Sequence, residues 1–68
     1  MNTRTPQIGD IWQDYLGHFL VLEEHPLTDS EKKRGYVCEI SILALNTGKI
    51  ENFWTITRMR LEELTFVA

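Results

Sequence analysis

The residues of this chain that could hold a metal are two histidines, a cysteine and a glutamate. His18, His25 and Cys38, together with Glu24, are side-chain types that ligate zinc, but their spacing matches no closed zinc site. Cys38 lies inside a predicted strand, where a small buried thiol is ordinary. We therefore expect no metal and no cofactor.

The serines make no better case for catalysis. Ser30 and Ser41 have no base beside them in the sequence, and the chain lacks the G-x-S-x-G, Walker, dinucleotide-binding and H-E-x-x-H motifs. A chain of 68 residues also offers little depth for a pocket that excludes water. We expect a binding protein and not an enzyme.

The aromatic side chains are better candidates for a functional surface. The chain has two Trp, two Tyr and three Phe, and we expect Phe19 and Phe66 to fill the core. Phe53 and Trp54 are neighbours, and neighbouring side chains of a strand point to opposite faces. Both cannot enter one core, so one of the two should face outward or pack against a loop or the tail.

Trp12 is a second candidate for exposure, because it shares a strand face with Asp10 and Asp14. Exposed tryptophan and tyrosine side chains often anchor protein interfaces. The alternative, in which the core or a loop covers these aromatics, stays open. The predicted partner-binding residues are Trp12, Tyr15, Phe53, Trp54 and Arg58.

Charge bears on the choice of partner. Seven Lys and Arg stand against ten Asp and Glu, a net charge of −3 with neutral histidines. Proteins that bind nucleic acid usually carry a basic surplus, because contacts to phosphates supply much of their affinity. Local basic groups exist at residues 32–34 and at Arg58 and Arg60, so binding to nucleic acid remains the alternative.

Turn signals divide the chain into short strands. We expect strands at 8–14, 19–24, 36–45 and 50–56, with a helical turn and a last strand at 64–67 in the tail. Thr28 and Glu31 form a capping-box pattern in the polar loop that follows Pro26. Residues 1–5 are polar and should be loose, and residues 6–68 should form a single domain.

This pattern resembles the SH3-like small barrels. The stretches "PQIGDIW", "LNTGKIENFW" and "RLEEL", with an apolar second strand and a polar loop between them, follow the layout of that group. The group includes SH3, KOW and Tudor domains and many short proteins encoded by bacteriophages. The resemblance implies an all-β fold, a small five-stranded SH3-like barrel. It carries no family-specific binding motif, and a shared fold alone does not imply a function.

The function that we expect is that of a non-catalytic adaptor or inhibitor that binds another protein. In one form of this hypothesis, the protein is encoded by a phage and acts on a host protein. The alternative is a barrel that binds nucleic acid through the 32–34 loop and stacking aromatics. A third reading is a homo-oligomer joined through edge strands. The first ten residues hold no apolar run and no stretch could span a membrane, so we expect no signal peptide, no membrane contact and a cytoplasmic location.

Overall fold

The computed structural model describes residues 4–68. Its elements are, in chain order, β1 (Ile11–Asp14), β2 (Gly17–His25), α1 (Asp29–Lys33), β3 (Tyr36–Ala44), β4 (Ile50–Thr57), α2 (Arg58–Glu62) and β5 (Thr65–Phe66). The five strands form one antiparallel sheet in the order β4-β3-β2-β1-β5. The prediction of a small all-β fold with five strands is therefore confirmed.

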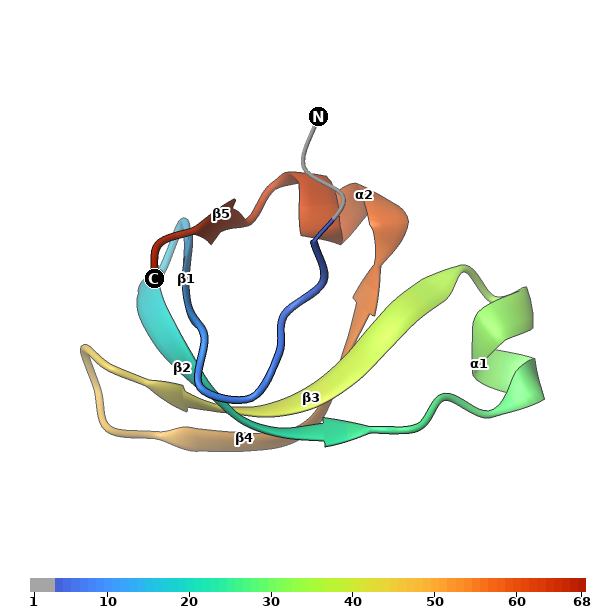
Figure 1. Ribbon diagram of the computed structural model, residues 1–68, viewed down its shortest axis with the longest axis horizontal. Helices are drawn as coiled ribbons and strands as arrows, with labels where there is room; N and C mark the ends of the chain where they lie inside the picture. Colours follow the sequence, from blue (N-terminus) through green and yellow to red (C-terminus); the bar gives the residue numbers. More distant parts are fainter. Residues whose placement is uncertain (1–3) are drawn as a thin grey trace.

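The sheet is strongly curved, and α2 and the N-terminal segment lie across the hollow of the curve (Figure 1). β4 and β5 are the two edges of the sheet. Within residues 4–68 no ladder joins these two edges, so the sheet is not closed into a barrel. The strand ladders therefore leave one side of the hollow open, and α2 crosses it.

β1 is shorter than predicted, because the chain turns before it. Gly9 has a φ of 88°, and the amide of Asp10 donates a hydrogen bond of 2.9 Å to the carbonyl of Gln7. The predicted strand over 8–14 thus begins only at Ile11, and Ile8 is exposed. Of the terminus predicted to be loose, residues 1–3 lie outside the described part, while Arg4 is paired with Asp10.

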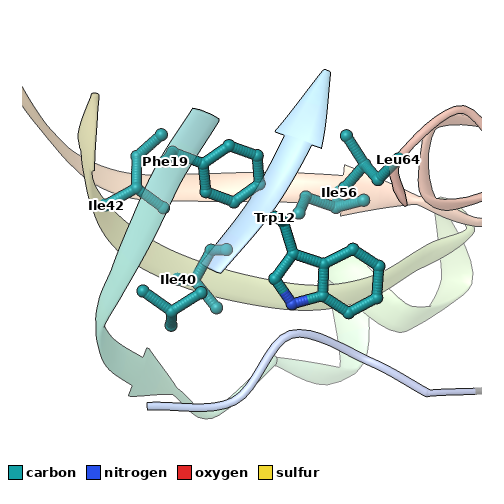
Figure 2. Close-up of a cluster of buried hydrophobic side chains, with 7 residues drawn as sticks. Trp12, Phe19, Ile40, Ile42, Ile56 and Leu64 are labelled. Atoms are coloured by element: carbon teal, nitrogen blue, oxygen red, sulfur yellow. The ribbon is translucent and has the colours of Figure 1, made fainter. Parts of the chain in front are cut away.

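The core occupies the inner face of the curve. Figure 2 shows the indole of Trp12 and the ring of Phe19 among aliphatic side chains from β3, β4 and the segment after α2. Burying side chains of this size contributes about 1.5–3 kcal/mol each. Phe66, predicted to be in the core, is instead partly exposed and packs edge-on against Trp12. The buried core residues are Trp12, Phe19, Val21, Ile40, Ile42, Ile56 and Leu64.

A β-bulge in β4 resolves the conflict between Phe53 and Trp54. Ile42 pairs with Glu51 and Ile40 pairs with Trp54, so Asn52 and Phe53 together oppose one residue of β3. Phe53 has a φ of 56°, which is uncommon for a residue other than glycine. The extra residue lets Trp54 turn to the core side while Phe53 stays exposed.

Both short helices begin at a threonine cap. The Thr28 side chain accepts a hydrogen bond from the amide of Glu31, whose carboxylate accepts one from the amide of Thr28. This is the predicted capping box, now seen at the start of α1. The Thr57 side chain caps α2 by accepting a hydrogen bond from the amide of Arg60. The tail therefore contains a helical turn and a last strand, as predicted.

Candidate binding groove

A groove of about 530 Å³ lies between the β1–β2 turn and the β3–β4 turn. In an antiparallel meander these two turns fall at the same end of the sheet, and Figure 1 shows them there, away from α1. Phe19, Ile42 and Ala44 form the apolar floor. The groove thus lies on the inner face of the sheet, at the end where these two turns meet it.

Two hydrogen bonds hold the turns together. The Asn46 side chain donates from Nδ2 to the carbonyl of Leu16 at 2.9 Å, and the amide of Leu45 donates to the carbonyl of His18 at 3.0 Å. Gly17 leaves room for this contact, because a Cβ atom there would lie 3.2 Å from Nδ2 of Asn46. The spacing between the two turns is therefore fixed by the fold itself.

Arg60 supplies the polar centre of one wall. Its guanidinium lies 5.1 Å from the ring centroid of Tyr15 and 5.9 Å from that of Trp54. Nη2 of the same group contacts Oδ2 of Asp14 at 3.3 Å. The charge of Arg60 is thus paired with Asp14 while its guanidinium also lies within cation–π distance of two aromatic rings.

Trp54 connects this wall to the floor. Its ring meets Phe19 edge-on, with centroids 5.2 Å apart and planes at 82°. Tyr15 stands at the rim and is 79% exposed. Two of the five predicted partner-binding residues, Tyr15 and Trp54, are therefore brought together in one place.

Trp12 is not on this surface, which corrects the prediction of an exposed Trp12. It is 0% exposed, and its Nε1 donates a hydrogen bond of 3.2 Å to Oδ2 of Asp10. The Arg4 guanidinium beside Asp10 holds the pKa of that carboxyl below its ordinary value, and the N–H groups of Gln7 and Trp12 act in the same direction. The neighbouring carboxylate that suggested solvent exposure is instead the buried partner of the indole.

Phe53 and Arg58 also lie outside the groove lining. Phe53 is 64% exposed and packs against His25, with ring centroids 4.5 Å apart. Arg58 is exposed at the start of α2, and Arg60, two positions later, lines the groove in its place. The signal that could have found Arg60 is Thr57, whose cap fixes where the helix starts and hence which arginine turns inward.

The structure pairs a serine with a histidine that the sequence keeps apart. Oγ of Ser41 lies 2.7 Å from Nε2 of His25, but Ser41 is only 2% exposed. Nucleophilic attack needs a substrate within reach of the hydroxyl, which this burial prevents. The Ser41 hydroxyl fixes the imidazole ring beneath Phe53, so we assign the pair a packing role.

The other chemistry-bearing residues are dispersed. Within residues 4–68 no three His, Cys, Asp or Glu side chains come together as a metal-binding group. Burial, and then the charge of Glu24, raises the pKa of the Cys38 thiol to about 11. Lys32 and Lys33 lie on α1, at the opposite end of the sheet from the groove (Figure 1).

Comparison with known proteins found no match to this chain among family models, curated proteins or solved structures. In the described part of the chain, no helix is long and apolar enough to cross a membrane.

Proposed function

We propose that this chain is a small non-catalytic binding module whose groove receives a segment of another protein. The observation that carries the proposal is the position of Arg60. Its guanidinium lies within cation–π distance of Tyr15 and Trp54, and all three residues line the groove between the two turns together with the apolar Phe19, Ile42 and Ala44.

The composition of the groove supports a protein partner. Tyrosine, tryptophan and arginine are the residue types most enriched among those that dominate binding energy at interfaces. Tyr15 is held at the rim by a turn that Asp14 stabilises, since Oδ1 accepts hydrogen bonds from the amides of Leu16 and Gly17. A partner would therefore meet a site that is largely formed in advance, which reduces the entropy cost of binding.

We also propose that the fold belongs with the SH3-like small barrels. The strand order β4-β3-β2-β1-β5, in which the last strand returns beside the first, supports this grouping. So does the short helix α2 between β4 and β5. The version in which the chain is phage-encoded and acts on a host protein rests on the sequence resemblance alone.

Nucleic acid is the less favoured partner. The net charge is −3, and the cations of α1 lie at the other end of the sheet from the aromatic residues of the groove. A single-strand binder needs a basic track beside its stacking rings. In the groove, the guanidinium nearest the rings is already paired with Asp14.

The test is a selection from a random peptide display library, followed by fluorescence titration of the enriched peptides. Tyr15→Ala should weaken their binding at least about tenfold, as loss of an interface anchor does. Met59→Ala is the matched control, because Met59 is also 79% exposed but does not line the groove. Labelled oligothymidylate and oligouridylate are titrated in parallel at low salt.

Peptide binding that is lost in Tyr15→Ala and kept in Met59→Ala supports the proposal. Three results would overturn it: no enriched peptide, equal binding by both variants, or tighter binding to the oligonucleotides that weakens steeply with salt.

A further inference from the structure

We infer that the groove selects an extended segment in which one apolar side chain lies between an acidic and a basic side chain. This inference rests on the proposed function and specifies the chemistry of the partner. It starts from two charged residues, Lys49 just before β4 and Glu51 within it, which line the groove on the side opposite Tyr15 and Leu16.

Lys49 precedes β4, but the amide of Ala44 donates a hydrogen bond of 2.8 Å to its carbonyl, so Lys49 continues the pairing of β4 with β3. Lys49 and Glu51 both line the groove and therefore project to the same side of this edge. Glu51 pairs with Ile42, whose side chain is buried on the inner face, while the intervening Ile50 pairs with Leu43. Side chains two residues apart in a strand lie on one face, about 7 Å from each other. A positive and a negative group therefore stand side by side along one wall.

These two charges have no salt-bridge partner among the described residues. Both residues are exposed. The other charged pair of the groove differs, because Asp14 and Arg60 contact each other and their side chains are 9% and 26% exposed. The wall formed by the β1–β2 turn therefore holds a charge pair that is already neutralised, and the wall formed by Lys49 and Glu51 presents one cation and one anion to a ligand.

An extended segment matches this arrangement by its own geometry. Its alternate side chains also point to one side about 7 Å apart, so positions i and i+2 can face Lys49 and Glu51 together. Position i+1 then points to the opposite wall, where Tyr15 and Leu16 are apolar and exposed. The segment that satisfies all three contacts has an acid beside Lys49, a base beside Glu51 and an apolar residue between them.

Segments with two like charges are disfavoured by the same arrangement. Two acids would place one carboxylate against Glu51, and two bases would place one cation against Lys49. Complementary charges at an interface act mainly on selection between ligands, so the signature to look for is a preference rather than a high affinity.

The experiment is a display library with a fixed leucine whose two neighbours are randomised among Asp, Glu, Lys, Arg, Ser and Ala. The protein is used in four forms: the parent, Lys49→Glu, Glu51→Lys and the control Lys32→Glu, whose changed residue is exposed on α1. The parent and the control should enrich one acid with one base. Lys49→Glu should enrich two bases, and Glu51→Lys should enrich two acids.

Each matched charge should change Kd by roughly twofold to fivefold at low salt, and the preference should fade at high salt. The same preference in all four forms, with binding still lost in Tyr15→Ala, would overturn this inference and leave the proposed function standing. Selection that is unaffected by Tyr15→Ala would overturn both.

Discussion

The indole Nε1 of Trp12 and the Oδ2 atom of Asp10 lie 3.2 Å apart, in a hydrogen bond that joins the core to the turn before β1. The same carboxylate accepts hydrogen bonds from Nη2 of Arg4 at 2.8 Å and from the amide of Gln7 at 2.9 Å. One side chain therefore satisfies a buried indole and fastens the N-terminal segment across the hollow of the sheet.

Asp10 should make stability depend on pH in the acid range. Its pKa in the folded protein is below the ordinary value of 3.8, chiefly because of Arg4. A carboxyl with a lowered pKa stabilises the fold above its unfolded pKa and loses that contribution as pH falls through the folded one. Urea unfolding should therefore give a lower free energy of unfolding at pH 3 than at pH 6. At pH 6, Asp10→Asn should be less stable than the parent protein by about 1–3 kcal/mol. Between pH 6 and pH 3, its free energy of unfolding should fall by less than that of the parent. An equal drop in both proteins would contradict this role.

Truncating a buried side chain of the sheet should lower stability much more than truncating an exposed one. Ile40 is fully buried on β3, whereas Ile50 is exposed at the start of β4. Ile40→Ala should lower the free energy of unfolding by about 2–5 kcal/mol, because it removes buried methyl groups and leaves a cavity. Ile50→Ala should cost less than about 1 kcal/mol. Thermal unfolding followed by circular dichroism measures both, and similar melting temperatures would contradict the assigned faces.

Gly17 should be coupled energetically to Asn46. A side chain at Gly17, where φ is 132°, is strained and would press a Cβ atom against the Asn46 amide. Gly17→Ala should therefore cost about 1–3 kcal/mol, part of which Asn46→Ala should relieve in the double variant. Gly48→Ala is the control, because it is strained at a φ of 74° but has no atom within 4 Å of the added Cβ. Strict additivity of Gly17→Ala and Asn46→Ala would show that the two turns are not in contact.

The Cys38 thiol should react slowly in the folded protein. Its pKa is raised from 9.0 to about 11, so near pH 8 its thiolate fraction is about a hundredfold lower than that of an ordinary cysteine. Alkylation by iodoacetamide, followed by mass spectrometry, should be at least tenfold slower than in urea and should accelerate as pH rises toward 10. Equal native and unfolded rates would place the thiol at the surface.

The parts of the fold that follow from local chemistry could be predicted from the sequence. The cap at Thr28 and Glu31 is an example, because its hydrogen bonds join residues three positions apart. The burial of Trp12 could not be predicted in this way. It depends on Arg4 and Gln7 satisfying Asp10, and a face that alternates tryptophan with aspartate gives no sign that the carboxylate is already paired.

The candidate site also combines features that the sequence predicts with features that depend on the fold. The crowding of Phe53 and Trp54 is visible in the sequence, and it correctly indicates that one of them faces out. Which one does so depends on the bulge opposite β3, since an extra residue reverses the alternation that follows it. Choosing Arg60 over Arg58 requires the start of α2, which is known only once Thr57 is seen to cap it.

The bulge at Phe53 also affects how copies of this chain can meet. β4 is the longer of the two edge strands, and an uninterrupted edge of that kind is a template on which further chains add as fibrils. The bulge breaks its regular hydrogen-bonding repeat near the middle and places the bulky Phe53 side chain there with a positive φ. A strand from another molecule can match this edge over only a few residues on either side of the bulge. The bulge at Phe53 therefore shortens the regular stretch of this edge on which a second strand could pair.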